Sequence, residues 1–203
     1  MSRSSLLAMC LIGFALSLAS IFLLDFRLAP LFLADETNRE IWGIITDLGN
    51  SGWMAILVIA TWLYASFFAK RQPDVPLWPR LRGKASYIFL AVLLPGLLVL
   101  VVKILVGRSR PYTGDLAFHP FTPGVDFASW PSGHATTVFS FAVAVGMVFP
   151  RLRWPLIAAA ALIGYSRLAL NMHYLGDVIA GATFGTVGAI MVYWWVAPKL
   201  GLK

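Results

Sequence analysis

The sequence predicts an all-α fold, an integral membrane bundle of six transmembrane helices with both termini cytoplasmic. Of its 203 residues, 59% are hydrophobic and 12% are charged, and the mean hydropathy is +0.79. A soluble domain usually has about twice that charged fraction, while the apolar residues suffice for about six spans of about 20 residues. These figures argue against a disordered chain, a collagen-like chain and a soluble enzyme. The single cysteine, Cys10, also excludes an intramolecular disulfide and a cysteine-based metal cluster.

Six continuous apolar runs justify the predicted helices, which cover 5–24, 50–69, 85–106, 133–149, 154–170 and 178–197. Helices are the expected form because a chain in lipid must satisfy its own backbone hydrogen bonds. A transmembrane β-barrel would instead show shorter segments of alternating polarity. The first run is too long for the apolar core of a signal peptide, so we interpret it as an uncleaved span. No repeat or long linker divides the chain, and residues 1–203 are predicted to form a single domain.

The charges between the runs indicate the orientation of the helices. On the side of the N-terminus, the loops and termini hold ten basic residues and one acidic residue, whereas the opposite side holds six basic and eight acidic residues. The positive-inside rule therefore places both termini in the cytoplasm and the connections 25–49, 107–132 and 171–177 outside. The net charge of +7 then reflects membrane topology, and no nucleic-acid partner is expected.

The outer connection before the second span carries a helical signal of its own. Thr37-Asn38-Arg39-Glu40 has the pattern of a capping box, and apolar residues follow at helical spacing up to Leu48. The pattern predicts a short amphipathic helix lying at the membrane interface, and a packed loop is the alternative interpretation.

Polar residues at the membrane boundary mark the candidate functional site, because such residues are costly near lipid. Lys103 lies close to the outer end of the third span, and Arg108 and Arg110-Pro111 follow it. A lone lysine in this place often extends its ammonium group to the interface, but three cations so close together indicate an anion-binding site. The planar guanidinium of Arg110 suits bidentate binding of a phosphate group.

A second cluster, Trp130-Pro131-Ser132-Gly133-His134, opens the fourth span. Pro131 suits the first turn of a helix, and backbone N–H groups at a helix N-terminus bind anions. Gly133 permits close approach of a phosphate, and the Ser132 hydroxyl supplies a further donor. Pro-Ser-Gly alone is a common helix start, but His134 beside it at the membrane boundary favours a functional site.

The third cluster, Ser166-Arg167 followed by His173 and Asp177, lies before the last span. If this stretch is helical, residues four apart share one face, and His173 and Asp177 can form a hydrogen bond. A carboxylate on one imidazole nitrogen raises the basicity of the other, which makes a nucleophile or a base. A structural histidine–aspartate pair at the interface is the alternative interpretation.

Together the clusters supply cations, a helix N-terminus, two histidines and an aspartate, which are groups that phosphoryl transfer needs. No pair of carboxylates near them in the sequence suggests Mg²⁺, and neither cysteine nor a third clustered histidine suggests zinc. The sequence therefore predicts a mechanism that uses no metal and no cofactor, with a histidine as the nucleophile.

The three clusters closely resemble the signature of the type 2 phosphatidic acid phosphatase (PAP2) family, in its membrane-bound bacterial branch of lipid phosphatases. That signature reads K-x6-RP, then PSGH, then SR-x5-H-x3-D, and all three motifs are intact and in order between Lys103 and Asp177. The resemblance implies that His173 attacks phosphorus and forms a phosphohistidine, and that Asp177 orients it. His134 would protonate the leaving group and then activate water.

The resemblance also implies a set of residues that bind the substrate phosphate. These are Lys103, Arg110, Ser132, Gly133 and Arg167. Arg108 lies outside the strict motif, so only a peripheral role is expected for it. The remaining histidine, His119, is interpreted as a solvated residue of the loop between the third and fourth spans.

The resemblance and the membrane-edge position of the motifs predict a lipid phosphatase at the outer face of a bacterial inner membrane. Phosphatidylglycerophosphate or phosphatidic acid, and undecaprenyl pyrophosphate, are the favoured substrates, and lipid A dephosphorylation or phosphate transfer is the alternative. A transporter of phosphorylated solutes is a rival of another class, although transporter sites usually lie at the membrane midplane. A lipid-binding scaffold would need no acid–base residues. The expected partners are the phosphorylated lipid and the bilayer, and the oligomeric state stays open, a monomer included.

Overall fold

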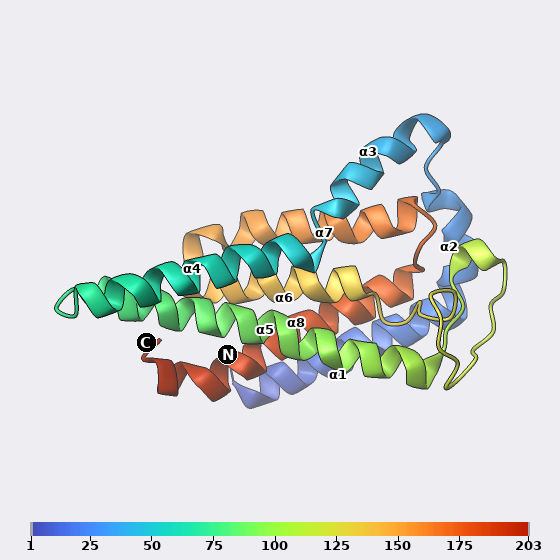
Figure 1. Cartoon of the computed structure of the whole chain (residues 1–203). Helices are drawn as coiled ribbons and strands as arrows, with labels where there is room; N and C mark the ends of the chain where they lie inside the picture. Colours follow the sequence, from blue (N-terminus) through green and yellow to red (C-terminus); the bar gives the residue numbers. More distant parts are fainter. Residues whose placement is uncertain (1, 203) are drawn as a thin grey trace.

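The computed structural model describes residues 2–202, which fold into α-helices joined by short turns and one long loop (Figure 1). The helices are α1 (Arg3–Ala19), α2 (Asp25–Phe32), α3 (Glu36–Asp47), α4 (Ser51–Arg71), α5 (Leu77–Val106), α6 (Gly133–Val148), α7 (Arg153–Ala169) and α8 (Leu175–Leu200). Within the described residues there is no β-strand, only an isolated bridge between Arg108 and Phe118. The prediction of an all-α fold is confirmed.

Four helical segments are long and apolar enough to cross a membrane. They are Arg3–Phe32, Glu36–Arg71, Leu77–Val106 and Leu175–Leu200. Two further helices in the bundle are shorter: α6 is apolar and has 16 residues, and α7 has 17. The chain therefore has the fold of a helical membrane protein.

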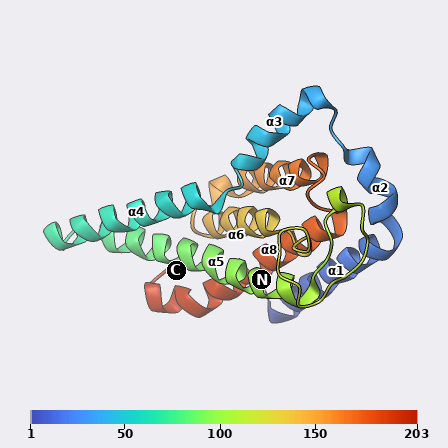
Figure 2. The same ribbon diagram turned by 45° about the vertical axis from the view of Figure 1, so that its right-hand side comes forward.

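Helix α8 lies at the centre of the bundle, where α1, α5 and α6 pack against it (Figure 2). Its glycines allow α6 to approach closely. A Cβ atom at Gly181 would lie 2.4 Å from the carbonyl oxygen of Ser132, and one at Gly185 would lie 2.4 Å from that of Thr136. Small residues commonly permit such close helix contacts in membranes. This crossing brings the start of α6 against the first half of α8, where two of the three sequence clusters lie.

The loop 107–132 and the turn between α7 and α8 lie at the same end of the bundle (Figures 1 and 2). The two chain termini lie towards the opposite end, together with the turn that joins α4 to α5. Because α5 runs along the bundle, its C-terminal turn carries Lys103 to the end that holds the other two clusters. The helix arrangement thus gathers all three clusters in one place.

Two helical segments are longer than the apolar runs predict. Helix α5 begins at Leu77 and not at residue 85, because its first turns are charged yet still helical. The first segment does not end at residue 24: a π-helical turn, Ser20–Leu24, leads into α2. Apolar runs report the part of a helix that meets lipid, and a helix can continue beyond it. A π-turn inside a helix often lies at a functional site.

The short helix predicted before the second span is confirmed as α3, but its capping residue differs. Asp35 is the N-cap, and its carboxylate accepts a hydrogen bond from the backbone N–H of Asn38 at 2.8 Å. The capping box predicted to start at Thr37 is therefore wrong. Aspartate caps a helix as well as threonine does, so the start was displaced by two residues.

Candidate active site

The three sequence clusters meet at the end of the bundle that carries the loop 107–132. Lys103 belongs to the last turn of α5, Ser132 caps α6, and His173 lies in the turn between α7 and α8. The backbone N–H of Ser132 donates to the carbonyl of Asp177 at 2.9 Å, and that of His173 donates to the carbonyl of Arg167 at 3.2 Å. Backbone hydrogen bonds thus join the second cluster to the third and hold the third together.

His173 and Asp177 form a buried pair, although they do not share one helical face. Helix α8 begins only at Leu175, with Tyr174 as its N-cap, so the condition that a helix runs through His173 is not met. The Nδ1 atom of His173 lies 3.5 Å from Oδ2 of Asp177, and the two side chains are 2% and 0% exposed. Catalytic contacts are often this long before a substrate binds. Nδ1 is thus the ring nitrogen that faces the carboxylate, although it has no hydrogen-bond partner among the described residues.

Hydrogen-bond donors hold both oxygens of the Asp177 carboxylate. Oδ1 accepts from the Arg108 guanidinium at 2.5 Å. Oδ2 accepts from the Ser129 hydroxyl at 2.5 Å and from the backbone N–H of Tyr174 at 2.9 Å. A carboxylate with this many fixed donors has one accessible orientation, and it therefore offers His173 a fixed acceptor.

The environment of His173 favours its neutral form. Burial lowers the pKa of the imidazole well below its ordinary value, and this effect exceeds the opposing influence of Asp177. The positive charges of Lys103 and Arg110 lower the same pKa further, which places both cations near the ring. His173 is therefore neutral at physiological pH and has the lone pair that a nucleophile needs.

Lys103 is buried and does not extend to the membrane interface. Its side chain is 9% exposed, and its ammonium group donates to the carbonyl of Ala128 in the loop 107–132. A Cβ atom at Gly133 would lie 3.7 Å from Cε of Lys103. The alternative interpretation of Lys103 as an interfacial lysine is therefore wrong. The structure places its positive charge beside the N-terminus of α6, where an anion would bind.

Arg110 and Arg167 each have N–H groups without a partner among the described residues. The Nε of Arg110 donates to the carbonyl of Val125 at 2.9 Å, and one terminal nitrogen lies 3.8 Å from the sulfur of Met172. Arg167 is buried and donates to the Thr46 hydroxyl at 2.8 Å, but its Nε–H has no partner among the described residues. Because a guanidinium has five donors, both side chains retain donors for a phosphate.

Helix α6 begins at Gly133, as the sequence predicts. Ser132 is the N-cap, and its hydroxyl oxygen accepts from the backbone N–H of Ala135 at 3.4 Å. Pro131 precedes the cap, so the expectation that it belongs to the first helical turn is wrong. Gly133 is the first helical residue, and the Ser132 hydroxyl, although fully buried, keeps its own hydrogen for an acceptor.

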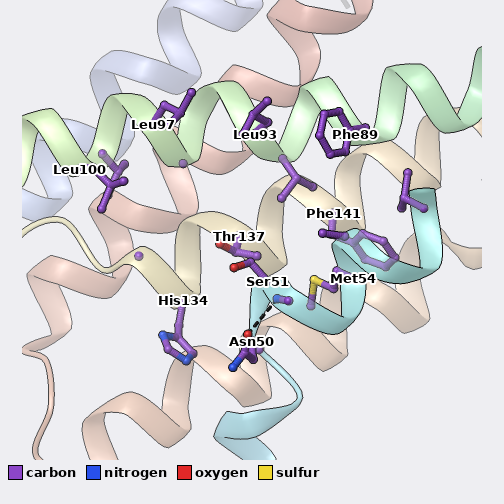
Figure 3. A pocket seen from close by; sticks show the side chains of 18 of the residues that line it. Asn50, Ser51, Met54, Phe89, Leu93, Leu97, Leu100, His134, Thr137 and Phe141 are labelled. Carbon is purple, nitrogen blue, oxygen red and sulfur yellow. Dashed lines mark hydrogen bonds between the residues drawn. The ribbon is translucent and has the colours of Figure 1, made fainter. Parts of the chain in front are cut away.

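His134 lines a cavity of about 480 Å³ that extends between α4, α5 and α6. Figure 3 shows His134 near one end of this cavity, with Phe89 and Phe141 further along it. Lys103 and Gly133 also line the end near His134, whereas most of the remaining wall is apolar. The volume lies in the range of small-molecule sites. The predicted site residues Lys103, Gly133 and His134 therefore lie at one end of a cavity whose remaining wall is mainly apolar, whereas His173, Arg110 and Arg167 do not line it.

Arg108 and Ser129 contact Asp177, and Asp25 contacts Arg108; these three residues were missed or misjudged from the sequence. Arg108 is 4% exposed and contacts both Asp177 and Asp25, so the expectation of a peripheral role for it is wrong. Asp25 is 2% exposed, and Ser129 is fully buried. Asp25 carried a usable signal, because an acid at the end of an apolar span is costly. Ser129 carried none, since a serine in a loop is common.

The position of His119 agrees with its interpretation as a solvated loop residue. Its Nε2 lies 2.7 Å from Oδ2 of Asp115, and the two side chains are 39% and 44% exposed. Its ring also packs on Phe127. Within the residues that the structure describes, no group of three or more His, Cys, Asp or Glu side chains is arranged to hold a metal ion. Independence from metals stays a prediction.

These features define a helical membrane protein with buried cations, two histidines and an aspartate at one end of its bundle. The chain belongs to the PAP2 superfamily, whose family model matches residues 84–200. It is similar to a lipid A 1-phosphatase of Rhizobium etli, 34% identical over 72% of this chain and 66% of the relative. It is also similar to undecaprenyl-diphosphatase BcrC of Bacillus subtilis, 25% identical over 62% and 58% of the two chains. The chain thus spans two thirds or less of the length of these relatives.

Two crystal structures share the fold. LpxE of Aquifex aeolicus aligns with a TM-score of 0.63 and 22% identity, over 84% of this chain and 95% of its own. The first transmembrane PAP2 type phosphatidylglycerolphosphate phosphatase of Bacillus subtilis aligns with a TM-score of 0.70 and 21% identity, over 95% and 96%. At such identities the similarity concerns the fold, and it agrees with the helical membrane architecture.

Proposed function

We propose that this protein hydrolyses a phosphomonoester or pyrophosphate bond of a membrane lipid. One observation carries the proposal: Lys103, Gly133 and His134 line one end of a cavity whose remaining wall is mainly apolar and runs between α4, α5 and α6. A lipid can place its phosphate among the cations while its hydrocarbon chain lies along this groove. A water-soluble phosphate ester would gain nothing from an apolar groove between membrane helices.

His173 is the proposed nucleophile. Its neutral Nε2 attacks the phosphorus atom while the bond from phosphorus to the lipid oxygen breaks, and Asp177 stabilises the positive charge that develops on the ring. His134 gives its proton to the leaving oxygen. This step forms a phosphohistidine at His173 and releases the lipid alcohol, or the lipid monophosphate when the substrate is a pyrophosphate.

Water completes the reaction in the second step. His134, now neutral, takes a proton from a water molecule, and the water oxygen attacks phosphorus. The bond between phosphorus and the nitrogen of His173 breaks, inorganic phosphate leaves, and His173 returns to its neutral form. Both steps need neutralisation of the phosphoryl oxygens. The proposed donors are Lys103, Arg110, Arg167, the Ser132 hydroxyl and the Gly133 backbone N–H.

The membrane topology is part of the proposal. We infer that α6 and α7 complete a set of six spans with the four longer segments, in a single domain over residues 1–203. The termini lie towards the end of the bundle opposite the site (Figure 1). The excess of basic residues in the loops at that end supports a cytoplasmic location. The site would then face the periplasm of a bacterial inner membrane.

The candidate substrates are phosphatidylglycerophosphate or phosphatidic acid, undecaprenyl pyrophosphate, and lipid A. The sequence favoured the first two groups over lipid A. The similarity to a lipid A 1-phosphatase over 72% of this chain supports lipid A as an equal candidate. All of these lipids share a phosphate at the membrane surface and a long apolar portion, so they fit the same arrangement of cations and groove.

A substrate panel tests the proposal. The purified protein in detergent, with EDTA present, is expected to release phosphate from at least one of these lipids, and His173→Ala gives the background. Absence of turnover on the whole panel would contradict the phosphatase function and favour a transporter. Activity that disappears in EDTA and returns with a divalent metal would contradict the metal-independent mechanism.

The groove has its own test at Gly96 on α5, which lines the cavity and has no atom within 4 Å of a Cβ placed on it. Gly96→Leu is therefore expected to fold and to fill part of the groove. The KM for the preferred lipid should rise about tenfold, while hydrolysis of a short soluble phosphate ester should stay unchanged. Gly43→Leu on α3 is the matched control, because Gly43 also has free space around it. Equal KM values for all three proteins would contradict the lipid groove.

A further inference from the structure

A buried ion pair lies directly behind the Asp177 carboxylate. The Arg108 guanidinium places Nη1 2.5 Å from Oδ1 of Asp177 and Nη2 2.9 Å from Oδ2 of Asp25. Arg108 and Asp25 are 4% and 2% exposed, and Asp177 is fully buried. One cation is thus shared between two buried carboxylates. Such charges are costly to desolvate, and removal of one partner leaves the others uncompensated.

Asp25 connects this ion pair to the first helical segment and to the start of α8. It lies where the π-helical turn Ser20–Leu24 meets α2. Its Oδ1 accepts from the Ser20 hydroxyl at 2.6 Å and from the backbone N–H of Gly176 at 2.9 Å. The Ser17 hydroxyl donates to the carbonyl of the same glycine at 2.8 Å. The first segment therefore holds both the arginine behind Asp177 and the backbone next to it.

The contacts of Arg108 differ from those of the arginines proposed to bind phosphate. Both terminal nitrogens of Arg108 face carboxylates, and its guanidinium carbon lies 4.3 Å from the centroid of the Tyr174 ring. Among the described residues, Arg110 and Arg167 contact neutral groups, a backbone carbonyl and a thioether sulfur for Arg110 and a threonine hydroxyl for Arg167, and both keep free donors. Both terminal nitrogens of Arg108 are thus occupied by contacts within the protein, whereas Arg110 and Arg167 have donors available for an anionic ligand.

We propose that Arg108 and Asp25 are positioning residues that together hold Asp177 in the orientation needed to align His173 for attack. The inference rests on the proposed phosphatase function and extends the active-site machinery to the first helical segment. Loss of either charge leaves its partner buried without a counter-ion, and the Asp177 carboxylate loses its fixed orientation. The phosphate-binding donors are untouched by this change, so turnover falls while substrate binding persists.

Kinetic constants of variants with little change in volume test the inference. Arg108→Gln and Asp25→Asn are each expected to lower kcat about 10- to 100-fold, with KM and the inhibition constant for inorganic phosphate unchanged. Arg108→Lys should recover part of the lost kcat, because it restores the charge without the paired geometry. Arg27→Gln is the matched control, since Arg27 lies on α2 together with Asp25 but is exposed. This variant should have the kcat and KM of wild type.

A double variant separates a coupled pair from two independent residues. Arg108→Gln combined with Asp25→Asn should lose no more kcat than the more damaging single variant, because each single change already disrupts the shared unit. Wild-type kcat in both folded single variants would overturn the inference, and so would a raised KM at unchanged kcat. Failure of both variants to elute as a folded protein would overturn it in favour of a purely structural role. An inactive wild-type protein would instead refute the proposed function itself.

Discussion

Two histidine–aspartate pairs in this molecule have the same spacing and different environments. His173 lies between α7 and α8 and Asp177 in the first turn of α8, with side chains 2% and 0% exposed. His119 and Asp115 lie in the loop 107–132, with side chains 39% and 44% exposed. The exposed pair has the shorter contact, 2.7 Å against 3.5 Å. Sequence spacing and pair distance therefore do not identify the pair with catalytic potential.

The two histidine–aspartate pairs differ in burial and in the hydrogen-bond donors around each carboxylate. The Asp115 carboxylate accepts from His119, from the backbone N–H of Ala117 and from the Ser109 hydroxyl, and these bonds order a loop. Water competes with an exposed pair of this kind, so its energetic weight is small. The buried pair is instead surrounded by the Arg108 guanidinium, the Ser129 hydroxyl and the positive charges of Lys103 and Arg110. Burial and nearby positive charges therefore distinguish this pair from the exposed one.

The largest difference between the two pairs should appear when each histidine is removed. His173→Ala is expected to lower kcat about 10⁴-fold or more, because the nucleophile is lost. His119→Ala should stay within about twofold of wild type, as surface substitutions usually do. Phosphate release by the two purified variants is the measurement. Comparable losses in both variants would remove the functional distinction between the pairs.

Substitution of the aspartate in each pair should again affect kcat differently, with a smaller loss than removal of the histidine. Asp177→Asn preserves the shape of the side chain but removes the charge that orients His173, and kcat should fall about 10³-fold. Asp115→Asn should leave kcat nearly unchanged, because its carboxylate serves only the loop. Wild-type turnover in Asp177→Asn would show that His173 needs no carboxylate.

The smallest expected effect concerns the pH dependence of stability in the loop 107–132. The hydrogen bond to His119, helped by the Ala117 N–H and the Ser109 hydroxyl, lowers the pKa of Asp115 to about 2. A lowered carboxylate pKa means that the stabilisation is present above the ordinary value and is lost as the pH falls towards the lowered one. The Tm of Asp115→Asn should lie slightly below that of wild type, by less than about 3 °C, at about pH 5. The difference should shrink at about pH 2.5, and a difference that grows in acid would contradict this assignment.

The sequence predicts the parts of the site that are local in the chain and misses those that form only when helices pack. Lys103, His134 and His173 stand out because polar residues at a membrane boundary are costly. Asp25 contacts Gly176, which is 151 residues away in the chain. No local pattern predicts that contact, because it depends on how α1 packs against α8. The last helix begins at Leu175, three residues before its predicted start, because Tyr174 is an unusual N-cap residue and gives no local signal.

Helix boundaries were predictable only where the chemistry changes sharply. Asn50 caps α4 by accepting from the backbone N–H of Gly52 at 2.8 Å, and the predicted start at residue 50 was close. The start of α5 was missed because its charged first turns resemble a loop in composition while remaining helical. The hydropathy of a segment indicates whether it lies in lipid or in water. It also predicts a helix only for segments in lipid, where the backbone must satisfy its own hydrogen bonds.

Covalent trapping of the proposed intermediate tests the central claim most directly. The purified protein is mixed with a ³²P-labelled lipid substrate, quenched in alkaline denaturant, in which phosphohistidine survives, and digested for peptide mapping. The proposed mechanism predicts label on the peptide that contains His173 and no label in His173→Ala. His134→Ala should carry more label than wild type if the variant slows hydrolysis of the intermediate more than its formation. Turnover of the substrate with no label on His173, or label on a different residue, would contradict it.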